Sequence, residues 1–331
     1  MLCMDDTKIS VIIPIYKVER FIERCVVSLM EQTLCDVEYI FVDDASPDGS
    51  VRILHEVLKR YPARQSNVNI ISHEENKGLP AARNTGLSVA QGEYIFHCDS
   101  DDFVEPTMLE ELYNATKKND ADIVWCDFFL TFEKNERYMK QPEYTKSKDA
   151  LKAMLSGAMK FNVWNKLARR SLYVDNSIQF PSGYGMGEDM TMMMLFACAK
   201  NVGYVSQAFY HYVKQNTGAF SQTYSLRHLE DLRYNVQRVV NYMQSRFGDE
   251  MEKELAFFKL DVKFPFLISN DKSKYNLWEE WYPEANKYIG KNKLISARGN
   301  ALQWCAARGW WFVVRLYYVL VNKLIYGIIY R

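Results

Sequence analysis

Short apolar runs alternate with amphipathic stretches over the first part of the chain. Residues 8–16 form a run of mostly β-branched apolar side chains, which predicts a strand, and residues 18–31 follow with apolar side chains at helical spacing. The alternation continues with strands expected at 37–42, 68–72, 93–98 and 121–129, and with helices expected at 51–61, 79–90 and 106–118. This order predicts right-handed crossovers and an α/β fold: a mostly parallel, Rossmann-like sheet with helices on both faces.

The pattern changes after about residue 145, where helical stretches predominate. Helices are expected at 148–156, 189–199, 226–246 and 250–268, with short extended pieces near Tyr204 and Tyr210. We therefore expect a sheet-containing domain over residues 1–215, a helical region over 216–298 and a distinct tail over 299–331.

The tail is basic and strongly apolar. Residues 291–331 contain seven Lys or Arg and no acid, and residues 310–330 are almost entirely apolar or aromatic. Arg308, Arg315 and Asn322 recur every seven residues, which places them along one side of a helix with Lys323 beside the last. A charge at mid-bilayer costs about 2.5–3.5 kcal/mol, so a helix lying in the membrane surface is favoured. A spanning helix, and a helix buried in the protein or in a homodimer contact, remain open.

Composition limits the class of protein and its compartment. The 41 Lys and Arg balance 41 Asp and Glu, whereas a protein that coats nucleic acid carries a basic excess. A hydrophobic content of 48% excludes wholesale disorder. Seven cysteines without a C-x-x-C pair predict reduced thiols, and residues 1–8 show no secretory signal. With the basic tail, this predicts a cytoplasmic protein held peripherally on the inner face of the cell membrane.

Two acidic loops follow predicted strands, at the sheet edge where ligands of parallel sheets bind. Asp43 and Asp44 can accept hydrogen bonds from a ribose or a base, while Asp48 or Ser46 is expected to cap the next helix. The loop Asp99-Ser100-Asp101-Asp102 gathers three carboxylates, whose repulsion a cation would relieve. Oxygen ligands from one short segment suit Mg²⁺ or Mn²⁺. A solvated acidic turn is the alternative.

Four segments in order resemble glycosyltransferase family 2, the inverting enzymes with a GT-A fold. They are Ser10–Tyr16, Val42–Ser46, Asn76–Asn84 and Asp99–Asp102, and the resemblance covers residues 8 to 215. It implies a nucleotide-diphosphate sugar donor, most often a UDP-sugar, and a divalent cation, Mn²⁺ or Mg²⁺.

The resemblance also implies a set of donor contacts. Asp44 matches the carboxylate that recognises the base, and Asp99 matches the residue nearer the ribose. The other residues expected to bind the nucleotide sugar are Pro14, Tyr16, Glu19, Lys77, Arg83 and Ser100.

The metal ligand and the base are implied in the same way. Asp101 matches the metal ligand, with Asp99 and His211 as further candidates. Asp189, in the segment Gly183–Asp189, matches the base that deprotonates the acceptor hydroxyl during an inverting displacement. A plain helix-capping role for Asp189 stays open.

Two further segments match less closely. Asn165 and Lys166 match a segment that shapes the acceptor side, although a core Trp164 with a solvated Lys166 is equally compatible. Where family members often carry Tyr-x-Tyr-Arg, this chain has Val213 at the Arg position. Lys214 or His211 would then supply the missing donor, and a packing role for His211 is the alternative.

The predicted function is therefore transfer of a sugar, a UDP-hexose or UDP-N-acetylhexosamine being expected, to a hydroxyl of a glycan or lipid-linked acceptor. Surface-polysaccharide synthesis is the expected setting. Two other classes stay in view: a non-catalytic, membrane-associated nucleotide-sugar-binding protein, and a Mg²⁺-dependent phosphatase. The phosphatase is less favoured because its D-x-D motif usually follows the first strand.

Overall fold

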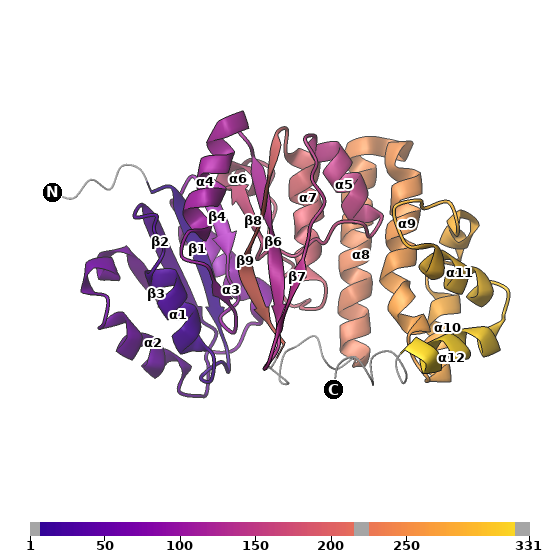
Figure 1. Cartoon of the computed structure of the whole chain (residues 1–331), viewed down its shortest axis with the longest axis horizontal. Helices are drawn as coiled ribbons and strands as arrows, with labels where there is room; N and C mark the ends of the chain where they lie inside the picture. The colour runs from indigo at the N-terminus through magenta and orange to yellow at the C-terminus, as the bar shows by residue number, and fades with distance from the viewer. Residues whose placement is uncertain (1–6, 215–224, 322–331) are drawn as a thin grey trace. The chain divides into compact units, whose positions relative to one another are not determined.

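The computed structural model describes residues 7–214 and 225–321 (Figure 1). The chain divides into two compact units. The first contains the chain up to Asp149 together with Phe161–Val239, and the second contains Ala150–Lys160 and the chain from Val240 onward.

The first unit contains a nine-stranded sheet whose first half is parallel. Four strands lie there in the order β3-β2-β1-β4, and all three of their pairings are parallel. They are β1 (Ile9–Ile15), β2 (Val37–Asp43), β3 (Val68–Ser72) and β4 (Tyr94–His97), joined through α1 (Ile22–Met30), α2 (Ser50–Leu58) and α3 (Leu79–Val89). These strands and helices follow the predicted ranges closely.

The second half of the sheet is mixed. Strand β8 lies between β4 and β6 and is antiparallel to both, whereas β6 and β9 are parallel. Its strands are β5 (Phe103–Val104), β6 (Ile123–Thr131), β7 (Glu136–Met139), β8 (Lys166–Arg169) and β9 (Val202–Val213), with helices α4 (Met108–Asn119), α6 (Arg170–Asp175) and α7 (Thr191–Cys198). Helix α5 (Ser147–Leu155) begins in the first unit, and most of it belongs to the second. The predicted α/β class is confirmed, with short antiparallel strands that the periodicity did not reveal.

Close packing of α3 on β1 fixes the position of the site. All seven residues of β1 are buried, as expected for a central strand. A Cβ at Gly86 would lie 2.4 Å from Cγ2 of Ile12, so only glycine allows α3 to approach β1 this closely. Arg83 lies one turn earlier on α3, and its guanidinium contacts Asp99 in the loop that follows β4.

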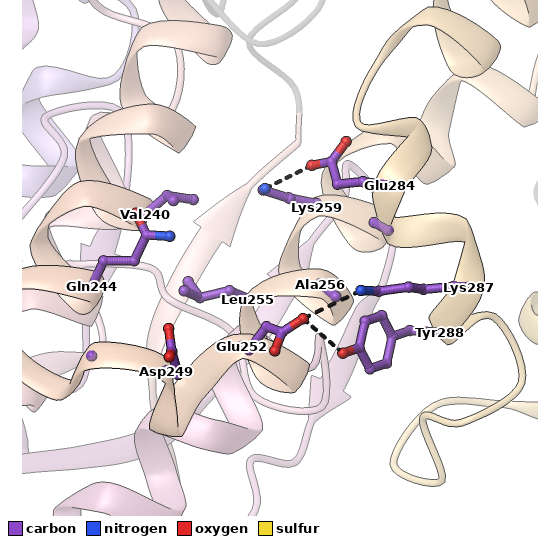
Figure 2. Close-up of a pocket in the computed structure, with 12 residues that line it drawn as sticks. Val240, Gln244, Asp249, Glu252, Leu255, Ala256, Lys259, Glu284, Lys287 and Tyr288 are labelled. Atoms are coloured by element: carbon purple, nitrogen blue, oxygen red, sulfur yellow. Dashed lines mark hydrogen bonds and ion pairs between the residues drawn. The ribbon is translucent and has the colours of Figure 1, made fainter.

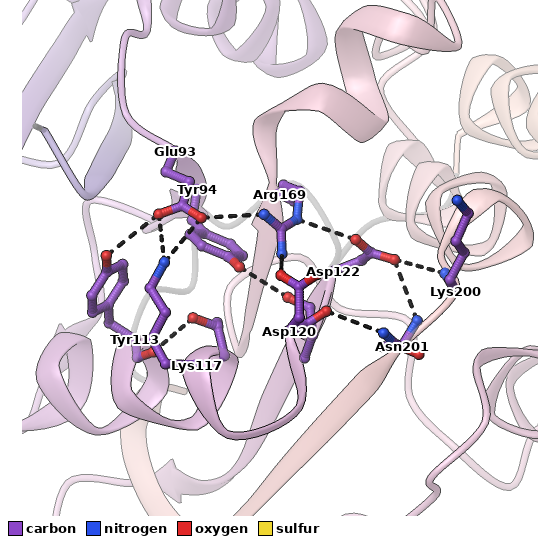
Figure 3. A network of polar contacts seen from close by, with 11 residues as sticks. Glu93, Tyr94, Tyr113, Lys117, Asp120, Asp122, Arg169, Lys200 and Asn201 are labelled. Atoms are coloured by element: carbon purple, nitrogen blue, oxygen red, sulfur yellow. Dashed lines mark hydrogen bonds and ion pairs between the residues drawn. The ribbon is translucent and has the colours of Figure 1, made fainter.

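A polar network ties the opposite edge of the sheet, where β4 and β6 begin (Figure 3). Arg169 at the end of β8 contacts Glu93 at 3.2 Å, Asp122 at 3.1 Å and Asp120 at 2.5 Å. Glu93 also accepts a hydrogen bond from Lys117 on α4. Since this edge lies away from the carboxyl ends of the parallel strands, we assign the network to stability.

The second unit is helical. Helix α8 (Leu226–Phe247) begins in the first unit and ends in the second, where α9 (Glu252–Lys263), α10 (Lys272–Glu280), α11 (Ala297–Ala306) and α12 (Trp311–Tyr318) follow. Pro265 stands where the predicted helix 250–268 breaks into α9 and a 3₁₀ turn. Among the helices of residues 7–214 and 225–321, none has the length and apolar character that a membrane crossing requires. The structure describes the predicted tail, residues 299–331, only as far as residue 321.

Candidate active site

Three neighbouring carboxylates follow β4, and the fold separates their roles. Asp102 is fully buried and accepts hydrogen bonds from the Tyr210 hydroxyl at 2.7 Å and from the Val213 amide at 2.7 Å. Burial, and then the charges of Asp101 and Asp99, raise the pKa of Asp102 well above its ordinary value. Asp102 therefore anchors this loop to β9, while about a quarter of the Asp99 side chain stays exposed.

Arg83 connects this loop to Asp189. Its Nη2 donates to Oδ1 of Asp99 at 3.0 Å and lies 3.8 Å from Oδ1 of Asp189. Burial alone would lower the pKa of Arg83, but Asp99, Asp189 and Glu188 outweigh burial and raise it. In the part of the chain that the structure describes, Nε and Nη1 of Arg83 are buried without a hydrogen-bond partner. These two donors therefore keep hydrogen-bonding capacity that the described residues do not use.

Asp189 lies in a 3₁₀ turn just before α7, and 22% of its side chain is exposed. Its Oδ1 is buried beside Arg83, without a hydrogen-bond partner among the described residues. Burial, partly offset by Arg83 and Lys166, raises the pKa of Asp189 to about 6. The carboxylate is therefore mostly ionised at neutral pH and can still accept a proton. Burial and the neighbouring Asp189 raise the pKa of Glu188 to about 8, which keeps that residue mostly protonated.

Lys166, at the start of β8, is only 1% exposed. Its Nζ donates to the Asn162 carbonyl and to Oδ1 of Asn165, each at 2.8 Å. Burial lowers the pKa of Lys166 to about 7, and the charge of Asp189 opposes this shift. The structure thus excludes a solvated Lys166 and brings it within electrostatic reach of Asp189.

Two side chains of α8 hold the glycine-rich loop that carries Asp189. Asp231 accepts a hydrogen bond from the Gly185 amide at 3.0 Å. Asn235, one turn later and fully buried, donates to the carbonyls of Tyr184 at 3.3 Å and Met186 at 3.0 Å. In the sequence these two positions appear only as polar residues four apart on a predicted helix, a pattern that does not by itself indicate contact with the Asp189 loop.

The ends of β1 and β2 carry the predicted nucleotide residues. Asp44 is 2% exposed and accepts hydrogen bonds from the amides of Lys77 and Gly78, both at 2.8 Å, and it contacts Nδ1 of His73 at 2.7 Å. In this structure Asp44 organises the loop that carries the exposed Lys77. Tyr16 is 41% exposed at the end of β1.

The other predicted residues near the carboxyl ends of β1 and β4 are buried or hydrogen-bonded to the neighbouring backbone. Oε2 of Glu19 accepts a hydrogen bond from the Gly49 amide at 2.8 Å. Asp48 accepts a hydrogen bond from the Ser50 amide at 3.1 Å at the start of α2, whose N-cap residue is Gly49 rather than the predicted Asp48 or Ser46. Pro14 is buried within β1, and Ser100 is 5% exposed.

His211 and Lys214 lie at the end of β9. The His211 ring is stacked between Phe103 and Phe129, and its two nitrogens contact Glu136 at 2.8 Å and Glu105 at 2.9 Å. This is the environment that the packing alternative expects. Partial burial lowers the pKa of Lys214, whereas Asp102 and Asp101 act in the opposite direction, so its ammonium lies near the loop after β4.

The donor set fits a divalent cation that relies on its substrate for further ligands. Across the described residues, no group of three or more His, Cys, Asp or Glu side chains could hold a metal ion by itself. Mg²⁺ is commonly bound through one or two carboxylates together with substrate phosphates. Asp101 and Asp99 can supply these two carboxylates, because Asp102 is used by the fold.

A separate pocket in the second unit is lined by charged side chains that already pair (Figure 2). Lys259 contacts Glu284 at 2.7 Å, and Glu252 contacts both Lys287 at 3.3 Å and the Tyr288 hydroxyl at 3.0 Å. None of the predicted catalytic or donor-binding residues lines it. We therefore place the candidate active site at the sheet edge.

Comparisons with known proteins bear on the family of the chain. A family model described as "Glycosyl transferase family 2" matches residues 10–187. The cholesterol galactosyltransferase of Borreliella burgdorferi is 33% identical over 296 residues, which cover 82% of this chain and 80% of that protein. The poly(ribitol-phosphate) beta-glucosyltransferase of Bacillus spizizenii is 33% identical over 215 residues, 64% of this chain and 33% of that protein.

The fold has a similar counterpart among solved structures. The crystal structure of S. aureus TarS 1-349 in complex with UDP-GlcNAc superposes with a TM-score of 0.71 at 20% identity, covering 94% of this chain and 91% of that one. This likeness confirms the predicted GT-A architecture.

Proposed function

The chain belongs to glycosyltransferase family 2, and we propose that it moves a sugar from a UDP-sugar to an acceptor hydroxyl with inversion, using Asp189 as the base. The observation that carries this proposal is the position of Arg83. One buried guanidinium contacts Asp99 of the acidic loop and lies beside Asp189, so residues from two distant segments share one site.

The protonation state of Asp189 supports its role as the base. A general base works best with a pKa near the working pH, and burial raises the pKa of Asp189 to about 6. Asp189 takes the proton from the acceptor hydroxyl while the hydroxyl oxygen bonds to the anomeric carbon. The bond from that carbon to the diphosphate breaks on the opposite face, and UDP leaves with the bonding electrons.

A divalent cation, Mn²⁺ or Mg²⁺, would be held by Asp101 with Asp99. Bound there, such an ion neutralises negative charge on a departing diphosphate. Asp102 is left out of this set because its oxygens already accept hydrogen bonds from β9. The Arg83 guanidinium contacts Asp99 of the same loop through Nη2 and adds positive charge for the donor.

The donor is proposed as a UDP-hexose or UDP-N-acetylhexosamine. Tyr16 follows β1, Asp44 follows β2, and Lys77 lies in the loop between β3 and α3. The Lys77 amide donates to Asp44, so these residues form one edge for a nucleoside. TarS, which shares this fold, was solved with UDP-GlcNAc, so this sugar nucleotide is the first donor to test.

The acceptor is proposed as a hydroxyl of a glycan or of a lipid-linked molecule, in surface-polysaccharide synthesis. One relative is named for cholesterol and another for poly(ribitol phosphate), so hydroxyls of both lipids and polymers occur as acceptor groups among relatives. Asn165 and Lys166 lie on the Asp189 side of the site, where this acceptor would approach.

A donor screen tests the proposal. UDP or GDP release is measured with UDP-GlcNAc, UDP-galactose, UDP-glucose and GDP-mannose, with Mn²⁺ and with a chelator. We expect turnover of a UDP-sugar that the chelator abolishes, and a fall of about a hundredfold in Asp101→Asn. The matched control Asp175→Asn, at an exposed acid of α6, should keep wild-type activity. UDP binding without turnover of any donor would instead favour a non-catalytic binding protein.

A further inference from the structure

Helix α12 exposes an apolar face. Phe312 is 78% exposed, Leu316 and Leu320 are each 45% exposed, and Val313 is 41% exposed. Phe312 and Leu316 follow one another at four-residue spacing on α12, and Leu320 continues this spacing just beyond the last residue of the helix, Tyr318. The three side chains therefore form one stripe with Val313 beside it. Large apolar side chains gathered on one helix face mark an interaction surface, whereas single exposed ones do not.

The opposite face of α12 is packed, so the exposed face is oriented by the fold. Val314 is fully buried. The Trp311 ring stacks on Tyr275 at 5.1 Å and meets the edge of Trp278 at 6.2 Å, both on α10. The helix is therefore anchored in the second unit by one side and presents Phe312 and its neighbours on the other.

Tryptophan and arginine flank this apolar stripe. Trp304 and Trp310 are 41% and 49% exposed, and their rings meet edge to face at 5.1 Å. The Arg308 guanidinium lies 3.5 Å from the centre of the Trp304 ring. Amphipathic side chains of these kinds are favoured where an apolar layer meets polar headgroups.

The charged side chains of the segment that carries this surface all have one sign. Residues 291–321 contain five basic side chains and no acidic one. All five are exposed: Lys291, Lys293, Arg298, Arg308 and Arg315. A surface of this charge attracts anionic lipid headgroups.

We propose that α11 and α12 form a docking surface for an anionic lipid bilayer, with α12 lying in the membrane plane. Phe312, Leu316 and Leu320 enter the acyl boundary, while Arg308 and Arg315 contact headgroups. A second copy of the chain is a poorer occupant, because a two-fold contact would set the same basic residues against each other. This surface is independent of the glycosyl-transfer chemistry.

Vesicle flotation of the full chain tests the proposal. Vesicles of phosphatidylcholine alone are compared with vesicles containing phosphatidylglycerol, at low and high salt. We expect binding to the anionic vesicles that weakens with salt, and a loss of roughly tenfold or more in affinity for Phe312→Ser with Leu316→Ser. The matched control Val174→Ser with Leu226→Ser, at exposed apolar residues of the first unit, should bind like wild type.

A second variant, Lys291→Gln with Lys293→Gln, tests charge at two exposed side chains. It should weaken binding to anionic vesicles and leave the thermal unfolding temperature unchanged. Failure of the wild-type chain to float, or floating that neither variant weakens, would overturn the proposal. Conversion of a stable dimer to a monomer by the Phe312→Ser and Leu316→Ser changes, without vesicle binding, would also overturn it and identify a second copy as the occupant.

Discussion

Removing the charge of Arg83 should move the pH dependence of activity. Asp189 has to be ionised to accept a proton, so turnover falls as pH drops through its pKa of about 6. The Arg83 cation lies 3.8 Å from Oδ1 of Asp189 and stabilises the ionised form. Arg83→Met therefore raises the pKa of Asp189, and turnover should be lost at a higher pH than in the wild type.

The size of the shift follows from Coulomb's law. At an effective dielectric constant of about 20, two unit charges 3.8 Å apart interact by about 4 kcal/mol. Asp189 is partly exposed, so we discount this interaction by about half, to about 2 kcal/mol, because solvent screens it. One pKa unit corresponds to about 1.4 kcal/mol, which predicts a shift of about 1.5 units. In a plot of kcat against pH, the acid limb is the part where kcat falls toward low pH. Its midpoint should move from about pH 6 to between about pH 7 and 8.

The assay is kcat for UDP release against pH from about 5 to 9, in the wild type, Arg83→Met and Arg83→Lys. The lysine variant keeps a cation near Asp99 and Asp189, so its acid limb should stay near that of the wild type. Thermal unfolding checks that each variant folds, because a buried charge partner has been changed. If Arg83→Met folds and its acid limb stays where it is in the wild type, Arg83 does not stabilise the ionised form of Asp189, and the reasoning is refuted.

Two further predictions separate positioning from stability. Asn235→Ala removes the bonds that hold the loop carrying Asp189, so kcat should fall by about ten- to a hundredfold with the KM for donor little changed. Glu230→Ala, at an exposed site of α8, is its control in the same steady-state assay. Arg169→Met should lower the free energy of unfolding by about 2 kcal/mol in urea titrations with kcat retained. Arg52→Met, which breaks one exposed ion pair, should cost less than about 0.5 kcal/mol. Loss of kcat in Arg169→Met would show that the network acts on the site.

The parallel half of the sheet could be predicted from the sequence because its strands are continuous apolar runs. Strand β3 was predicted at its observed residues, and β1 and β2 to within one residue at each end. The short strands β5, β7 and β8 were missed, since two to four residues cannot display a periodicity and their pairing depends on tertiary contacts. The twelve-residue β9 was expected only as separate short pieces. Its pairing with β6 shifts register opposite Asp127 of β6, and this irregularity interrupts the alternation of apolar and polar residues.

The sequence predicts which loops carry the candidate site, but not how their side chains lie relative to one another. The loops carrying Asp99 and Asp189 stood out by composition and by resemblance. Their link through Arg83 depends on how closely α3 packs against β1, which no local pattern reveals. Tertiary packing also determines that Asp102 is buried. It likewise brings Asn235 within hydrogen-bond distance of the loop that carries Asp189.

The most direct test of the account measures kcat and the Kd for UDP in parallel, for wild type, Asp189→Asn and Glu188→Gln. Asp189→Asn should lower kcat by about 10²–10⁴-fold, because the amide cannot take the acceptor proton, and should leave UDP affinity unchanged. Glu188→Gln should keep most of the activity, since burial and the neighbouring Asp189 raise the pKa of Glu188 to about 8 and it is already mostly protonated at neutral pH. Wild-type turnover in Asp189→Asn would contradict the central claim that Asp189 is the base.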